Sequence, residues 1–179
     1  MRIKALIVGV NNYIDSEGLR YCVNDATSVR ELLRNIYDPK DMILISDGLE
    51  PRFTPLRNNI LSNIRLISET AEEKDNIFFY FAGHGKDISG EPVLLSSDYR
   101  DEIGLDAAIR IEDVKKEFAN SKAKFKLLIL DSCHSGAVKG REESGRMSSS
   151  MLEVINDVPE GFAIISACGL NQISFENEK

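Results

Sequence analysis

The stretch Lys126-Leu-Leu-Ile-Leu-Asp-Ser-Cys-His-Ser-Gly136 decides the fold of this chain. Its apolar run, Leu127–Leu130, is typical of a strand that is buried on both faces of a parallel sheet. The run ends in the small and polar residues Asp131, Ser132 and Cys133. Open α/β sheets bind their ligands at the carboxyl ends of their strands. The sequence therefore predicts that Cys133 lies at the edge of the sheet where a functional site is expected.

A second stretch, Asn76-Ile-Phe-Phe-Tyr-Phe-Ala-Gly-His-Gly85, has the same build and delivers His84 to the same edge. A thiol with a pKa near ~8.5 needs a base or a positive neighbour to become a strong nucleophile at neutral pH. A Cys–His nucleophilic pair is therefore the first hypothesis, with His84 as the base. Gly83 and Gly85 allow a sharp turn, and the amides of Gly85 and Cys133 are candidates for holding an oxyanion.

Two other interpretations of these residues remain open. One is a buried structural cysteine beside a core histidine. The other is a metal site that is built from His84, Cys133, His134 and Cys168. None of these four residues has the close Cys-x-x-Cys or His-x-x-x-His spacing that is typical of zinc, so the metal site is disfavoured and no metal is assigned.

Apolar runs of strand length alternate with helix-spaced segments along the rest of the chain. The pattern predicts strands at Ile3–Val10, Asp41–Ser46, Asn76–Phe81, Pro92–Ser96, Phe125–Leu130 and Phe162–Ala167. It predicts helices at Cys22–Tyr37, Leu56–Ala71, Ile111–Asn120 and Met151–Val158. We expect Asn24 or Asp25 to cap the first helix and Thr54 to cap the second. The fold class is therefore α/β, a single domain over residues 1–179 with a mainly parallel central sheet and helices on both faces.

Composition narrows the classes of partner. The chain has 179 residues, 22 basic and 29 acidic side chains, and a net charge of -7. This balance argues against nucleic acid and favours cationic substrates. No apolar stretch reaches the roughly 20 residues that span a bilayer, and the first residues lack a signal-peptide cleavage site. Three widely spaced cysteines fit a reduced, cytoplasmic setting better than a disulfide framework.

Five motifs, taken together, carry a resemblance to a known family. They are Ala5-Leu-Ile-Val-Gly-Val-Asn-Asn-Tyr13, Cys22-Val-Asn-Asp-Ala26, Tyr80-Phe-Ala-Gly-His-Gly85, Asp131-Ser-Cys-His-Ser-Gly136 and Ser166-Ala-Cys168. In this order they resemble the caspase-like cysteine peptidases, and most closely the metacaspase and bacterial caspase-like branch. The resemblance implies cleavage of peptide bonds, with His84 as the general base and Cys133 as the nucleophile.

The resemblance also implies a preference for substrates with Arg or Lys before the scissile bond. Asp131 lies where metacaspases place a pocket carboxylate, Asp25 matches their second pocket acid, and Cys22 matches a residue of the pocket wall. Glu176 falls where caspases carry an arginine that binds a substrate aspartate. It would present a negative charge in place of that positive one. The competing interpretations are a helix cap for Asp25 and a solvated tail residue for Glu176.

Departures from the family pattern suggest partners and cofactors. Family members continue with another strand and helices, so we expect a C-terminal small-subunit segment or a regulatory module beyond Lys179. Self-processing is expected near Lys179 or in the polar segment Lys139–Ser150. Many metacaspases need calcium, but the acidic residues Asp98, Asp101, Glu102 and Asp106 match no ligand pattern. They are interpreted as a solvated loop, and no cofactor is assigned.

Two alternatives from other functional classes are kept beside the peptidase. The first is a non-catalytic caspase-like scaffold that binds protein partners, although the presence of both His84 and Cys133 argues against it. The second is a small-molecule hydrolase or acyltransferase, for which the sequence lacks a Gly-x-Ser-x-Gly elbow. The resemblance alone implies a role in bacterial defence or programmed cell death.

Overall fold

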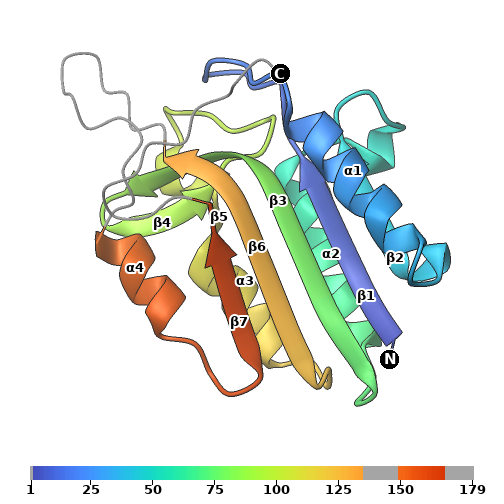
Figure 1. Ribbon diagram of the computed structural model, residues 1–179. Helices are drawn as coiled ribbons and strands as arrows, with labels where there is room; N and C mark the ends of the chain where they lie inside the picture. Colours follow the sequence, from blue (N-terminus) through green and yellow to red (C-terminus); the bar gives the residue numbers. More distant parts are fainter. Residues whose placement is uncertain (1, 135–148, 168–179) are drawn as a thin grey trace.

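The computed structural model describes residues 2–134 and 149–167, with backbone alone for residues 133 and 134. Parallel strands form the centre of its sheet (Figure 1). Their order across the sheet is β2 (Met42–Ser46), β1 (Arg2–Gly9), β3 (Asp75–Ile88), β6 (Phe125–His134) and β7 (Phe162–Ser166). The predicted α/β class with a mainly parallel sheet is therefore confirmed.

Strand β3 is longer than the sequence predicts. It continues past Phe81 to Ile88 and turns back through Ser89 and Gly90, both with positive φ, into the antiparallel strand β4 (Glu91–Leu94). Strand β5 (Ile109–Arg110) pairs with β4 and completes the seven-stranded sheet. His84 consequently lies inside a paired strand, whose ladder restrains its backbone, and not in a loop beyond the strand end.

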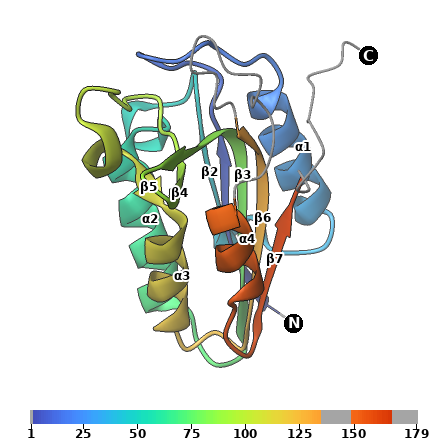
Figure 2. The same ribbon diagram turned by 90° about the vertical axis from the view of Figure 1, so that its left-hand side faces the viewer.

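Helices cover the two faces of the sheet unequally (Figures 1 and 2). Helix α1 (Cys22–Arg34) packs on one face, against β1, β2 and β3. On the opposite face lie α2 (Arg57–Thr70), α3 (Ile111–Ala119) and α4 (Ser149–Asn156). Short 3-10 helices occupy Pro39–Asp41, Pro51–Phe53 and Gly104–Ala107. None of the described helices combines the length and the apolar character that crossing a membrane requires.

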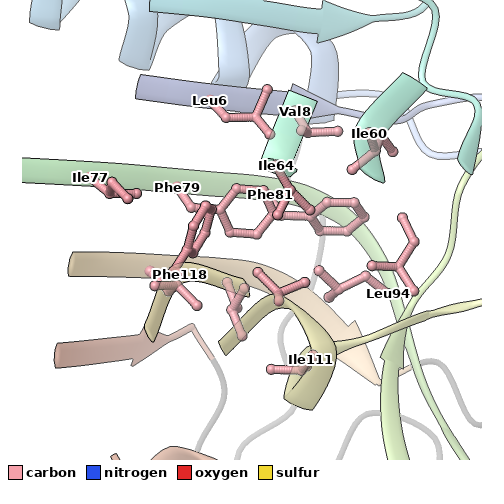
Figure 3. Close-up of a cluster of buried hydrophobic side chains, with 14 of the residues drawn as sticks. Leu6, Val8, Ile60, Ile64, Ile77, Phe79, Phe81, Leu94, Ile111 and Phe118 are labelled. Carbon is pink, nitrogen blue, oxygen red and sulfur yellow. The ribbon is translucent and has the colours of Figure 1, made fainter. Parts of the chain in front are cut away.

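The larger hydrophobic core lies between the sheet and helices α2, α3 and α4. Alternate residues of each strand enter it, as the two-residue period of a strand requires. Phe79 and Phe81 of β3 are fully buried there, and the Phe79 ring packs at 5.9 Å from the ring of Phe118 in α3 (Figure 3). The other face carries a smaller core with α1, where a Cβ at Gly9 would come within 2.5 Å of the Cys22 carbonyl oxygen. Glycine at this position therefore lets α1 lie directly on β1.

Both predicted helix caps are wrong. Helix α1 begins at Cys22, so Asn24 and Asp25 lie inside its first turn, and the Oδ1 atom of Asn11 accepts the backbone N–H of Val23 at 3.2 Å. This contact comes from a residue that lies 12 positions before Val23 in the chain. At α2, an Oδ1 atom of Asp98 accepts the first N–H of the helix at 2.8 Å. The Thr54 hydroxyl donates instead to the Pro51 carbonyl at 2.7 Å.

Candidate active site

The register of the sheet brings the two predicted catalytic positions together. His84 of β3 and Cys133 of β6 are Cα partners in neighbouring parallel strands, and Gly85 is the partner of His134. Neighbouring strands lie about 4.8 Å apart, which is within reach of short side chains. Sequence reasoning expected one shared edge of the sheet. The structure sets the two residues directly side by side.

The imidazole of His84 is held by a backbone carbonyl. Its Nε2 atom lies 2.7 Å from the carbonyl oxygen of Glu17, and the His84 residue is only 6% exposed. A carbonyl oxygen can only accept a hydrogen bond, so Nε2 carries a proton. In the neutral imidazole Nδ1 is then the unprotonated nitrogen. This tautomer leaves Nδ1 as the atom that can take up a proton.

Tyr13 packs against His84 and holds its backbone. The Tyr13 hydroxyl accepts the backbone N–H of His84 at 2.8 Å and donates to the Val10 carbonyl at 3.2 Å. The two rings lie 4.6 Å apart between centroids. A Cβ at Gly83 would meet the Tyr13 hydroxyl at 2.6 Å, so this close approach requires glycine. Burial raises the pKa of the Tyr13 phenol, which keeps it protonated as a donor.

The loop that carries Tyr13 is fixed at its start by the end of strand β2. One carboxylate oxygen of Asp47 accepts the backbone N–H groups of Asn11 at 2.6 Å and Asn12 at 3.2 Å. The carbonyl of Asn11 accepts the N–H of Leu19 at 2.8 Å, which closes the loop on itself. The Asn-Asn pair after the first strand therefore shapes the backbone that reaches His84.

Two acidic residues, Asp131 and Asp25, lie beside this site on the face that α1 covers. We call them the acidic cluster. The buried Tyr80 of β3 donates its hydroxyl to an Oδ2 atom of Asp131 at 3.1 Å. Burial raises the pKa of the Tyr80 phenol, and the negative charges of Asp131 and Asp25 raise it further. Cys22 packs in the same hydrophobic cluster as Tyr80. Tyr80 is thus a common neighbour of the three predicted pocket residues Asp131, Asp25 and Cys22.

Glu176 and Cys168 lie outside the described residues. Within the described ranges, no group of three or more His, Cys, Asp or Glu side chains is arranged to hold a metal ion.

The acidic residues after β4 have structural partners of their own. Asp98 caps α2, Asp101 pairs with Lys86 at 2.7 Å, and Asp106 pairs with Arg110 at 3.5 Å. Asp101, Glu102 and Asp106 are exposed, whereas Asp98 is tied to the start of α2.

Sequence reasoning missed three contributors to the site: the Glu17 carbonyl, Tyr13 and Tyr80. A backbone carbonyl has no signature in a sequence, since every residue carries one. Tyr80 offered a signal, because it is the one hydroxyl in the run Phe78-Phe-Tyr-Phe81. A buried phenol needs a hydrogen-bond partner, and a partner near the strand end was to be expected.

Comparison with known proteins shows which family this chain belongs to. The family model of the caspase domain matches residues 2–179. Metacaspase-1 of Schizosaccharomyces pombe is 32% identical over 147 residues, which cover 74% of this chain and 34% of that protein. Metacaspase-1 of Candida glabrata is 30% identical over 149 residues, which cover 76% of this chain and 38% of that protein. The chain thus spans about a third of the length of these curated relatives.

A solved structure shares the fold. The crystal structure of protein GSU0716 from Geobacter sulfurreducens matches with a TM-score of 0.61 at 15% identity, covering 77% of this chain and 53% of that one. At this identity the likeness concerns the fold alone. The family match extends over nearly the whole sequence and includes both the His84 and the Cys133 motifs. The chain is similar in sequence to metacaspases, and it belongs to the caspase domain family of cysteine peptidases.

Proposed function

We propose that this chain is the catalytic part of a cysteine endopeptidase in which His84 and Cys133 form the dyad. The observation that carries the proposal is their direct pairing across β3 and β6. It is supported by the Glu17 carbonyl, which selects the His84 tautomer with Nδ1 as the base. The family to which the chain belongs makes protein or peptide the class of substrate.

The chemistry follows from these positions. The Nδ1 atom of His84 takes the thiol proton, and the Cys133 thiolate attacks the carbonyl carbon of the scissile peptide. The amides of Gly85 and Cys133 stabilise the oxyanion of the tetrahedral intermediate. His84 then returns its proton to the leaving amine, and a thioester to Cys133 remains. Water, deprotonated by His84, hydrolyses the thioester and regenerates the thiol. The Glu17 carbonyl stabilises the imidazolium that forms twice in this cycle.

We assign the acidic cluster to recognition of Arg or Lys before the scissile bond. Asp131, oriented by Tyr80, supplies the carboxylate that pairs with the substrate cation. Asp25 adds a second negative charge from the first turn of α1, and Cys22 forms part of the wall. Glu176 remains a proposed third acid of the pocket.

Substitution of the dyad tests the proposal. Cys133→Ala and His84→Ala should each abolish cleavage of peptides that carry Arg or Lys before an activated amide, while the folded state persists. His134→Ala is the matched control, because His134 is the only other histidine in the chain. It should retain activity. Turnover that survives in Cys133→Ala would disprove the assignment of the nucleophile, and a wild-type chain that cleaves none of these peptides would favour the partner-binding scaffold.

The wider setting is proposed on the family resemblance alone. A small-subunit segment or a regulatory module is a further partner, and self-processing occurs in segment 139–150. The location is the cytoplasm, in a bacterial defence or cell-death system. Intact masses of the full-length gene product, wild type beside Cys133→Ala, measure self-processing directly. Equal masses would argue against it.

A further inference from the structure

The carbonyl that holds His84 sits on a surface segment. Glu17, Asp15 and Ile14 are exposed, and the segment from 13 to 18 has no regular secondary structure. The proposed mechanism needs the Glu17 carbonyl at hydrogen-bond distance from Nε2 throughout the cycle. Fixing a flexible backbone in one geometry costs conformational entropy, so some contact must offset this cost.

The contact comes from the segment that follows β4. The backbone N–H of Asp101 donates to one carboxylate oxygen of Asp15 at 3.1 Å, and the Arg100 guanidinium lies 3.3 Å from the other oxygen. The Ile14 N–H donates in addition to the Ser97 carbonyl at 3.2 Å. Asp15 lies two residues before the Glu17 carbonyl.

Strand β3, which carries His84, also contacts the segment that holds Asp15. The Nζ atom of Lys86 donates to the Asp101 carboxylate at 2.7 Å and lies 5.6 Å from the centre of the Tyr99 ring. Lys86 is two residues beyond His84 in the same strand. The path thus runs from His84 through Lys86, Asp101 and Asp15 back to the Glu17 carbonyl. The hydrogen bond from Lys86 keeps the pKa of Asp101 below its usual range, so the pair stays charged at neutral pH.

We propose that Asp15 is a positioning residue for the general base. Arg100 and Asp101 hold its carboxylate, and Lys86 anchors Asp101 to β3. We call these four residues the Asp15 clamp. The clamp fixes the Glu17 carbonyl against Nε2 and so keeps Nδ1 of His84 directed at its proton-transfer partner. This inference rests on the proposed dyad, and it adds a determinant that lies outside the reacting groups.

Substitution of Asp15 tests the clamp. Asp15→Ala removes the acceptor of the Asp101 N–H and the partner of Arg100. We expect kcat on an Arg peptide to fall about tenfold, since small misplacements of catalytic groups cost up to about 100-fold. KM should change less than twofold, because the clamp does not touch the acidic cluster. Asp15→Asn keeps an acceptor but loses the charge, and it should fall between the wild type and Asp15→Ala.

A second readout separates this inference from the peptidase proposal. The rate at which iodoacetamide alkylates Cys133 at pH 7, followed by mass spectrometry of its peptide, reports the thiolate and needs no substrate. Asp15→Ala should slow this alkylation several-fold, even if the natural substrate is not a peptide. His84→Ala sets the lower limit of the rate.

The matched control is Glu91→Gln, which breaks the ion pair of Glu91 with Arg110 at 3.0 Å on the neighbouring hairpin. It should leave kcat and the alkylation rate within twofold of the wild type. Equal thermal midpoints of all variants would show that the fold is retained. Alkylation and turnover in Asp15→Ala that match the wild type would overturn the clamp, as would equal losses in Glu91→Gln. Should Asp15→Ala not fold, Asp15→Asn decides by the same two rates.

Discussion

His84, which we propose as the general base, shows how much of a side chain's geometry is decided by its neighbours. Its Nε2 faces a carbonyl oxygen, its backbone N–H faces a phenol, and its ring packs on that same phenol. The carbonyl selects the tautomer, the phenol oxygen holds the backbone in place, and the packed rings restrict rotation of the imidazole. A histidine that is fixed in these three ways needs little change of its own geometry during proton transfer.

Tyr80 has an equivalent role for the acidic cluster, and Tyr80→Phe tests it. The substitution keeps the ring in the core and removes only the hydroxyl that donates to Asp131. A hydrogen bond to a charged group contributes about 1.5–3 kcal/mol, so kcat/KM for Arg peptides should fall about tenfold or more.

Peptides with Asp before the scissile bond serve as the comparison in this experiment. Their low rate should not fall in parallel, because Asp131 does not attract them. Tyr37→Phe, a tyrosine beyond the far end of α1, is the matched control and should leave the ratio unchanged. If Tyr80→Phe leaves the ratio of Arg to Asp cleavage unchanged, the cluster does not bind the substrate cation.

At the scale of elements, helices are held by residues that sequence patterns assign to the surface. Lys115 of α3 is only 5% exposed, and its ammonium group donates to the carbonyl oxygens of Val154 at 3.1 Å and Asp157 at 2.7 Å. It also pairs with Glu112 at 3.0 Å. These carbonyls belong to the end of α4, where a helix has acceptors without internal partners and where a cation is favourable. Lys115 therefore fastens the C-terminal end of α4 to α3.

Lys115→Met should destabilise the protein and loosen α4. The side chain keeps its apolar length but leaves the two carbonyls without their donor, which costs about 2 kcal/mol. Urea denaturation measures the loss in the free energy of unfolding, and hydrogen exchange of residues 152–157 should quicken.

Lys116→Met is the matched control for this substitution. Lys116 is the next residue of α3, its side chain is 67% exposed, and it lies 4.0 Å from the same Glu112. An exposed pair of this kind contributes at most about 1 kcal/mol, so its loss should hardly be measurable. Equal effects of the two substitutions would show that Lys115 acts only through Glu112.

At the scale of the whole molecule, burial of tyrosine phenols links stability to alkaline pH. The pKa values of Tyr13 and Tyr80 are raised in the folded state, chiefly by burial. Below pH ~10 both phenols are protonated in the folded and the unfolded chain, so stability is unaffected. Above it, the unfolded chain releases protons that the folded chain retains. The free energy of unfolding should therefore fall by about 1.4 kcal/mol per pH unit for each tyrosine.

Urea midpoints measured between pH 8 and 11.5 test this linkage. Tyr80→Phe and Tyr13→Phe should each reduce the alkaline slope by the contribution of one tyrosine. A wild-type slope that Tyr80→Phe does not alter would mean that this phenol already ionises in the folded protein.

The sequence by itself determined the class of fold and led to the two positions that we propose for the dyad. The apolar runs before His84 and Cys133 are a local property, and burial on both faces requires them wherever a parallel sheet forms. Glycines and polar residues indicate where each apolar run ends, although β3 continues beyond its run to Ile88. Strand type and the shared edge could therefore be predicted from composition and period alone.

Only the tertiary structure decided the register and the orientation of the base. The direct pairing of His84 with Cys133 depends on how β6 aligns with β3, and a buried apolar run fits several alignments equally well. The Glu17 carbonyl and the Tyr13 hydroxyl reach His84 across 67 and 71 residues of chain. The Glu17 contact uses a backbone atom that every residue possesses, so no residue type marks it, and the folded chain alone selects which carbonyl meets the imidazole.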